Sequence, residues 1–146
     1  MNIFDYLMIG KNNWSEMPEL KPRDRGAWIE FLDKKTTSEL LDISIAKWHA
    51  LAKAIDEEGR YIMDGGIETC ALCQRFHSRE FSGSSDGCDG CPIKAYTGLS
   101  GCGNTPYEDY EEFYAYEDVL DPQGEHAIEL AQAEAEFLER VREKGY

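Results

Sequence analysis

Two pairs of cysteines constrain the fold of this chain more than any other feature. In each pair two residues separate the cysteines, and fourteen residues lie between the pairs. A two-residue spacing lets both thiolates face one point, and two such knuckles supply the tetrahedral set of sulfur ligands that suits zinc. The intervening loop, 74–87, is rich in Ser and Gly and can close freely. The spacing predicts one structural Zn²⁺ site with four ligands: Cys70, Cys73, Cys88 and Cys91.

Other uses of the cysteines stay open. An iron–sulfur cluster also takes four cysteines, and Cys91-Pro92 is typical of ferredoxins, but the compact run of ferredoxin cysteines is absent. A thioredoxin-like redox role needs a βαβ context that the sequence does not show. Cys102 is either a spare thiol or a replacement for one ligand, and His77 is a further candidate ligand within the loop.

The predicted zinc site is of a structural and not a catalytic type. Four thiolates close the coordination sphere of zinc, so no position remains for water or substrate. The His-x-Glu signature of zinc deaminases is absent, because Ala50-Leu51 follow His49 and neither His77 nor His126 has a Glu two residues on. Phosphate-binding glycine motifs are missing as well. We therefore expect a protein without catalytic activity of its own.

The balance of charge restricts the partners. The 146 residues include 29 acidic and 15 basic ones, a formal net charge of −14. Such a charge excludes generic nucleic-acid binding by a basic surface and suits a basic protein partner. The first residues lack the pattern of a signal peptide, and no apolar stretch is long enough to cross a membrane. We expect a cytoplasmic protein, a setting in which closely spaced cysteines bind metal more often than they form disulfides.

One helix is clearly marked in the sequence. Thr36 and Glu39 form the pattern of a capping box, which predicts a helix over 37–58. Gly59 follows at the position of a helix C-cap. Apolar residues recur on one face of this helix at intervals of four and three: Leu41, Ile45, Trp48, Ala52 and Ile55. His49 lies one position off that face, and we do not expect it to be a metal ligand or a catalytic residue.

Further helices are predicted on both sides. A short helix near 24–33 interrupts an otherwise extended or irregular segment, 1–35. Thr105-Pro106 begins a helix to about residue 118, and Asp121-Pro122 begins a last helix to about residue 143. The apolar face of the last helix is formed by Ile128, Ala131, Ala135 and Leu138, flanked by Leu130, Phe137 and Val141.

These elements predict a mainly α fold in one domain, 1–146. Three or four helices surround a loop-rich ribbon or knuckle segment that zinc staples together. The segments are an irregular start (1–35), a helix (36–59), the metal-binding segment (60–105) and an acidic helical segment (106–146).

The last third of the chain carries most of the negative charge. Residues 101–146 contain 13 acidic and three basic residues, and no Lys or Arg lies between Lys94 and Arg140. Tyrosines such as Tyr107 and Tyr110 alternate with the carboxylates. One interpretation is the solvated face of amphipathic helices. The other is a surface that imitates the phosphate charge of DNA and occupies the basic groove of a DNA-binding protein.

The cysteines and their surroundings resemble a known pattern. The runs Cys70-Ala71-Leu72-Cys73, Cys88-Asp89-Gly90-Cys91-Pro92, Gly101-Cys102 and Thr105-Pro106-Tyr107 resemble short uncharacterised proteins, many of them from bacteriophages. The resemblance covers about residues 40–140. It implies a phage or prophage origin and a structural metal, and it brings no known activity.

The combined hypothesis is a small acidic protein-binding module, stabilised by zinc and encoded by a phage, that acts on a host or phage protein. A DNA-mimic inhibitor is its sharpest form. A redox or iron–sulfur protein is one alternative. A nucleic-acid-binding zinc ribbon is another, and it rests on Arg75 and Arg79. Nothing in the sequence indicates an oligomeric state.

Overall fold

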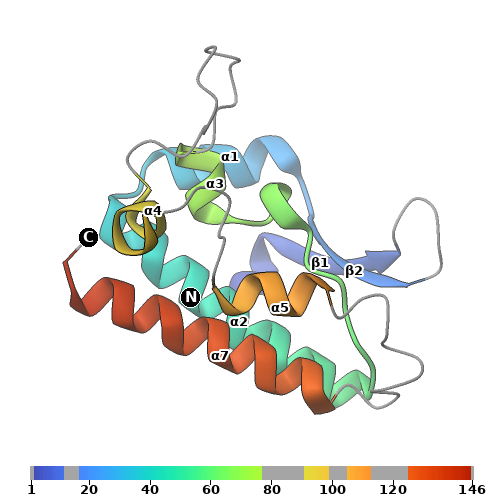
Figure 1. The fold of residues 1–146 in the computed structure, drawn as a ribbon. Coiled ribbons are helices and arrows are strands. Elements are labelled where there is room, and N and C mark those ends of the chain that lie inside the picture. The colour runs from blue at the N-terminus through green and yellow to red at the C-terminus, as the bar shows by residue number, and fades with distance from the viewer. Residues whose placement is uncertain (1, 12–16, 77–90, 99–104, 113–124, 146) are drawn as a thin grey trace.

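Two long antiparallel helices form the centre of the molecule. The computed structural model describes residues 2–11, 17–76, 91–98, 105–112 and 125–145. Helix α2 spans Thr37–Glu58 and helix α7 spans Glu125–Glu143, and the two pack along their lengths (Figure 1). Arg142 lies 2.9 Å from Asp42 and His49 lies 3.3 Å from Glu139, so the helices run in opposite directions.

Helix α2 has the local signals that its sequence predicts. The Thr36 hydroxyl accepts a hydrogen bond from the Glu39 amide at 3.2 Å, and the Glu39 carboxylate accepts one from the Thr36 amide at 2.9 Å. This capping box satisfies two amides that the helix start would otherwise leave unpaired. At the other end Gly59 takes a left-handed conformation with φ of 71°, which a residue without Cβ adopts at little cost.

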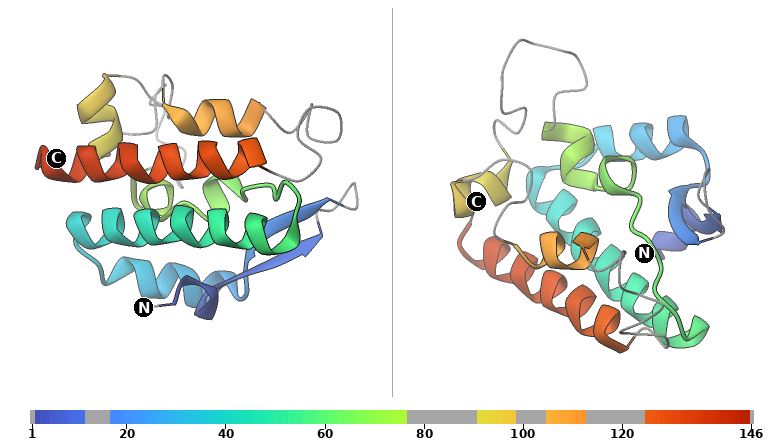
Figure 2. Two further views of the ribbon diagram at one scale, coloured as in Figure 1. Left: turned by 90° about the horizontal axis from the view of Figure 1, so that it is seen from below. Right: turned by 45° about the vertical axis from the view of Figure 1, so that its right-hand side comes forward.

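Shorter helices pack around this pair. Helices α4 (Pro92–Thr97) and α5 (Pro106–Glu112) contact α7, while α1 (Arg25–Asp33) and α3 (Ala71–Phe76) contact each other. Helix α3 also packs on α2. Figure 2 shows α4 and α5 on one side of α7 and α2 on its other side. The mainly α fold that the sequence predicts is therefore confirmed.

A small β-hairpin at the start of the chain is a finding that the sequence did not predict. A single turn of 3₁₀-helix, η1 (Ile3–Asp5), leads into β1 (Leu7–Lys11), which pairs antiparallel with β2 (Pro18–Pro22). Met63 adds one parallel bridge to β2, and its carbonyl accepts from the Leu20 amide at 2.9 Å. The hairpin therefore fixes the chain just before the cysteine pair.

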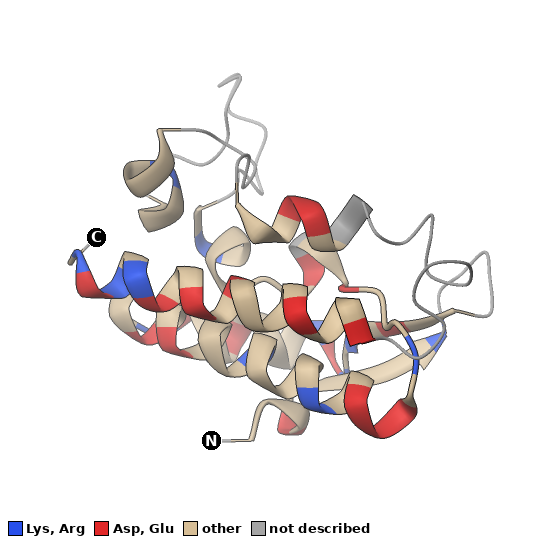
Figure 3. Cartoon of the chain, turned by 60° about the horizontal axis from the view of Figure 1, so that its bottom comes forward, with Lys and Arg blue, Asp and Glu red and all other residues tan. Residues whose placement is uncertain are grey.

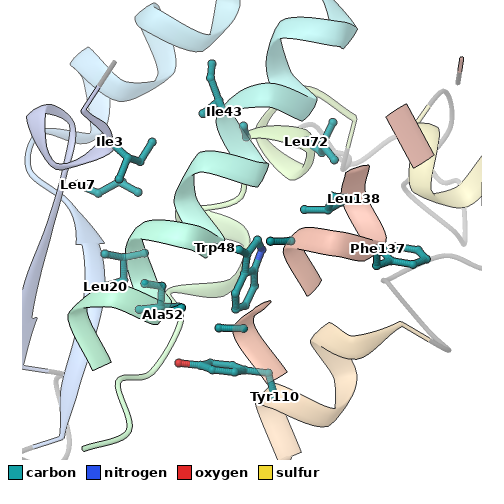
Figure 4. Close-up of a cluster of buried hydrophobic side chains, with 14 of the residues drawn as sticks. Ile3, Leu7, Leu20, Ile43, Trp48, Ala52, Leu72, Tyr110, Phe137 and Leu138 are labelled. Carbon is teal, nitrogen blue, oxygen red and sulfur yellow. The ribbon is translucent and has the colours of Figure 1, made fainter. Parts of the chain in front are cut away.

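The apolar core lies between α2, α7 and the elements that cover them. Trp48 of α2 meets Tyr110 of α5 edge to face, with ring centroids 5.1 Å apart (Figure 4). Tyr110 is fully buried and its hydroxyl donates to the Ile62 carbonyl, while the Tyr61 hydroxyl donates to the Tyr110 carbonyl at 3.0 Å. These reciprocal hydrogen bonds satisfy both buried phenols and tie α5 to the segment after α2.

The predicted boundaries of the other helices agree with the structure where it describes them. Helix α1 covers the expected segment, and Asp24 caps it by accepting from the Ala27 amide at 3.0 Å. Helix α7 ends at Glu143, as expected. The extension of α5 to residue 118 and the predicted cap at Asp121 lie outside the described residues. On α7, Ala131, Ala135, Phe137, Leu138 and Val141 are buried, whereas Ile128 and Leu130 are only partly so.

Candidate functional site

The first cysteine pair is held as a knuckle. Cys70 lies directly before α3 and Cys73 lies within its first turn. The Cys73 amide donates to the Cys70 sulfur at 3.3 Å, and neither thiol is in a disulfide. The Cys70 amide donates to the Gly66 carbonyl at 3.1 Å. The backbone therefore brings two thiols together and gives one of them an amide donor, as a metal-binding knuckle requires.

Helix α1 fixes this knuckle from both sides. The Trp28 indole N–H donates to the Glu68 carbonyl at 3.0 Å, just before Cys70. After Cys73, the Arg75 guanidinium donates to the carbonyls of Leu32 and Lys35 at 2.8 and 2.9 Å. Arg75 thereby ties α3 to the C-terminal end of α1, in addition to the hydrogen bond that the Leu32 carbonyl accepts from the Lys35 amide. The nucleic-acid-binding alternative loses support, because this guanidinium is already engaged, and Arg79 lies outside the described residues.

Behind the knuckle is a buried ion pair. The Lys47 ammonium of α2 lies 3.0 Å from Asp64 Oδ1, and the two side chains are 3% and 4% exposed. The Thr69 hydroxyl donates to the same oxygen at 3.0 Å, and the Gly66 amide donates to Oδ2 at 3.0 Å. Asp64 is thus satisfied by three donors, which is the condition under which a buried carboxylate is tolerated.

The loop that carries Asp64 needs a glycine. A Cβ on Gly65 would lie 2.4 Å from the Leu20 carbonyl oxygen and 2.5 Å from Thr69 Cγ2. Both distances are too short for nonbonded atoms. Gly65 therefore permits the close approach of the loop to β2, and this approach places Asp64 beneath Lys47.

Glu134 is a second buried acid, contributed by α7. Its side chain is 3% exposed, and in the described parts of the chain its Oε1 has no hydrogen-bond partner. The pKa of Glu134 is raised to about 8, mainly by burial. The charges of Cys70 and Asp64 act in the same direction, whereas Lys47 and a hydrogen bond from the Tyr107 backbone oppose them. Glu134 is therefore mostly protonated at neutral pH. We refer to Lys47, Asp64, Thr69 and Glu134 as the polar cluster.

The polar cluster acts on the cysteines through its charge. A hydrogen bond from the Cys73 side chain, together with the Lys47 ammonium and the Cys73 amide, lowers the pKa of Cys70 to about 6, against the effect of burial. Burial disfavours the charge on Lys47, yet Asp64 and the two cysteines together raise its pKa. The site therefore favours a thiolate at Cys70 and an ammonium at Lys47.

Of the remaining predicted and candidate ligands, the structure describes Cys91 alone. Cys91 is buried at the N-cap of α4, where its carbonyl accepts from the Ala95 amide at 3.1 Å. Among the described residues, no three Cys, His, Asp or Glu side chains form a group that could hold a metal ion. Cys88, Cys102 and His77 lie outside those residues. The structure thus brings Cys70 and Cys73 together and does not group Cys91 with them.

A second candidate site is the outer face of α7. Glutamates follow one another along it at intervals of four, seven, three and four residues, which keeps them on one side of a helix. All are exposed, and we call them the glutamate stripe: Glu125, Glu129, Glu136, Glu139 and Glu143. Figure 3 shows acidic residues along α7 and at the end of α2. Two exposed histidines lie beside the stripe: His49 of α2 is 3.3 Å from Glu139, and His126 of α7 is 3.5 Å from Glu129.

Sequence reasoning missed the polar cluster although the signal was present. Lys47 lies four residues after Ile43 and four before Leu51, on the buried side of α2. Glu134 lies three residues after Ala131 and four before Leu138, on the buried side of α7. A charged residue within an apolar stripe is a signal of a buried polar site, so both positions could have been singled out in advance, although not their partners.

Comparisons with known proteins leave both sites without a precedent. Models of protein families, curated proteins and solved structures yield no significant match to the chain. In the parts of the chain that the structure describes, no helix combines the length and the apolar character needed to cross a bilayer.

Proposed function

We propose that this chain is an acidic protein-binding module that docks on a basic surface of another protein, with its cysteine side stabilised by a metal ion. The glutamate stripe is the observation that carries the proposal. The opposite side of α7 is buried against α2 and α5, so the helix cannot turn its carboxylates inward. Its exposed charges speed encounter with a basic partner and disfavour acidic ones.

The charge density of the glutamate stripe can be compared with that of duplex DNA. Helix α7 has 19 residues, and at about 1.5 Å per residue the stripe extends over roughly 27 Å. Duplex DNA carries one charge per ~1.7 Å, or about 16 over that length. Five glutamates supply about a third of this, so the stripe alone favours docking over full mimicry. The DNA-mimic form of the proposal needs further carboxylates, of which Glu108 and Asp109 are exposed on α5.

The test replaces part of the stripe and compares it with a matched surface. The triple variant E129Q/E136Q/E139Q removes three charges from α7, and D56N/E57Q/E58Q removes three exposed charges from the end of α2. The probes are purified basic bacterial DNA-binding proteins, titrated with the fluorescently labelled chain. Exposed ion pairs contribute about 0.5 kcal/mol each, so we expect the stripe variant to bind about tenfold more weakly.

The control variant should bind within about twofold of the wild type, because its charges lie outside the stripe. Equal weakening in both variants would show that net charge alone matters and would contradict a stripe-specific interface. A labelled DNA duplex, added as competitor, separates docking from mimicry. Only a mimic is displaced by DNA from the nucleic-acid groove.

For the metal we propose the predicted set, Zn²⁺ on Cys70, Cys73, Cys88 and Cys91. Support comes from the described half of the set: two adjacent thiols that are not in a disulfide, an amide donor to one sulfur and a nearby cation. Elemental analysis of the purified protein should find one zinc per chain. C70S and C73S should lose it, whereas C102S should keep it if Cys102 is a spare thiol. Iron with visible absorbance would indicate a cluster, and full zinc content in C70S would contradict the proposed ligands.

A dithiol redox function is the second candidate. The observation that favours it is that Cys70 and Cys73 lie together while Cys91 is not grouped with them. In the reaction, the Cys70 thiolate attacks a disulfide of the substrate and releases one substrate thiol. The Cys73 sulfur then attacks Cys70, so the protein is oxidised to a disulfide and the substrate is reduced to two thiols. Oxidised glutathione is the probe, and mass spectrometry reads the loss of two hydrogens. Thiols that stay metal-bound and unreactive would exclude this function.

The place of action follows from the resemblance to phage proteins. A phage-encoded module of this kind would meet its partner in the cytoplasm of a bacterial host, which is also the compartment where reduced cysteines persist.

A further inference from the structure

The knuckle at the start of α3 fixes two thiols relative to each other. Cys70 directly precedes the helix and Cys73 follows three residues later, so both side chains lie on one side of the helix start. The Cys73 amide donates to the Cys70 sulfur at 3.3 Å. The Cys70 amide donates to the Gly66 carbonyl, and its carbonyl accepts from the Gln74 amide at 3.0 Å. Contacts within residues 66–74 therefore suffice to hold the pair together.

The surroundings make the pair both anchored and accessible. Trp28 of α1 donates to the Glu68 carbonyl just before the pair, and Arg75 just after it donates to two carbonyls at the end of α1. Both cysteines are only partly buried, and neither is in a disulfide. An ion from solvent can therefore reach two thiols whose positions are already set, which lowers the entropy lost on binding.

The number and softness of the ligands indicate which ion suits the pair. Zn²⁺ in a structural site takes four ligands, twice the number that the knuckle brings together. Cu(I) is a soft cation that selects thiolates over oxygen ligands. Its filled d shell also lets it bind just two ligands in a line. Cys70 and Cys73 are thus a complete ligand set for Cu(I) and half of one for Zn²⁺.

We propose that Cys70 and Cys73 form a two-thiolate site for Cu(I), a soft monovalent cation, and that this site works without the second cysteine pair. Two copper–sulfur bonds form and the thiol protons are released to solvent, so neither copper nor sulfur changes its oxidation state. The inference assigns a further ion to two thiols of the proposed zinc site. It does not rest on that site, because it requires neither Cys88 nor Cys91.

The competing explanation is purely structural. A residue directly before a helix often accepts a hydrogen bond from the amide three positions on, and Ser, Thr, Asp and Asn do this best. Cys70 would then be a helix cap and nothing more. Cys70→Ser separates the two explanations, because it keeps an acceptor for the Cys73 amide and removes a soft ligand.

The experiment titrates the reduced full-length chain with Cu(I), without oxygen, in competition with a chromophoric Cu(I) chelator. C70S and C73S should bind the first equivalent more than about 100-fold more weakly, since loss of a residue that only supports a ligand already costs about 10- to 100-fold. The matched control, C88S/C91S, should bind it no more than about twofold more weakly than the wild type, as expected for independent sites. Circular dichroism checks that each variant is folded.

Two results would overturn the proposal. Unchanged Cu(I) affinity in folded C70S would leave Cys70 as a helix cap. A loss in C88S/C91S as large as that in C70S would show that copper needs the second pair.

If C88S/C91S does not fold, alkylation of the wild type by N-ethylmaleimide decides. The first equivalent of copper should slow the alkylation of Cys70 and Cys73 and leave the rates at Cys88 and Cys91 unchanged. Slower alkylation of all four cysteines would overturn the proposal.

The zinc proposal is tested separately, by the metal content of the chain as purified. A chain without zinc, together with Cu(I) binding by C88S/C91S, would contradict the four-cysteine zinc site and support this inference. One zinc per chain, together with lost Cu(I) binding in C88S/C91S, would support the zinc site and overturn this inference.

Discussion

The two halves of the molecule are stabilised in different ways. Helices α2 and α7 meet mainly through apolar side chains, with Leu51, Ile55 and Ala131 among the fully buried residues. The cysteine side consists of short helices that add a few buried apolar side chains to the core, such as Leu72, and that are joined by polar contacts of Arg75 and Trp28. Isolated helices as short as α3 are not stable in water. The comparison indicates that the helix pair provides the stability, whereas the cysteine side depends on that pair and on the metal that we propose.

The largest expected effect lies in the helix pair. Trp48→Ala removes the ring that packs against Tyr107 and Tyr110. Truncation of such a buried aromatic residue costs about 3–5 kcal/mol of the free energy of unfolding. Urea denaturation measures it, and His49→Ala, one residue further at an exposed position, should change stability by less than about 0.5 kcal/mol. Similar losses in both variants would contradict the view that this interface dominates stability.

The next effect is a pH dependence at the boundary between the two halves. The folded state raises the pKa of Glu134 from 4.5 to about 8, so between these values the folded chain binds more protons than the unfolded one. Stability from this group is therefore lost as the pH rises above 4.5. Glu134→Gln should gain stability on the order of 4 kcal/mol at pH 8 and almost none at pH 4.

Thermal unfolding of both chains across this pH range gives the difference, in which the titration of other groups cancels. Glu136→Gln, an exposed neighbour on the same helix, is the control and should show no such slope. A gain for Glu134→Gln that is equal at pH 4 and pH 8 would mean that the buried acid is not the source of the pH dependence.

The smallest effect tests the polar contacts of the cysteine side. Arg75→Met removes two hydrogen bonds to the end of α1. The loss should be about 2 kcal/mol, because each bond involves a charged donor and the carbonyls at a helix end regain water. Hydrogen exchange should accelerate in residues 70–76 and not in α7. Uniform acceleration in both regions would show that the two halves unfold as one unit. It would contradict the view that the helix pair is more stable than the cysteine side.

Much of the helical framework could be predicted from the sequence because its signals are local. Helix α2 begins at the capping box of Thr36 and ends at Gly59, as its residues predict, and α7 ends where expected. The hairpin was missed because its two strands lack the sequence pattern of a strand. Strand β1 contains Gly10 and β2 begins and ends with proline, so neither has the pattern of a strand. Tertiary contacts, and not propensity, form it.

The candidate site was predicted in part. The spacing of Cys70 and Cys73 predicts a knuckle, and the structure brings them together. Lys47, Asp64 and Glu134 come from separate segments, so no spacing relates them in the sequence. Their contribution depends on how α2, α7 and the loop after α2 meet in three dimensions. The ligand role of Cys88 and Cys91 stays a prediction.

The bridge at Met63 has a consequence for how this chain can change over evolution. Its amide donates to the Pro18 carbonyl at 2.8 Å, and Gly65 has no room for a side chain beside Leu20. A substitution that moves the hairpin therefore moves the loop that carries Asp64, although about forty residues separate them in the sequence. The hairpin and the cysteine pair are therefore structurally coupled, and we expect them to change together during evolution. Recombination that exchanges one without the other is expected to yield chains with a disturbed cysteine site, so the two segments should vary together among descendants.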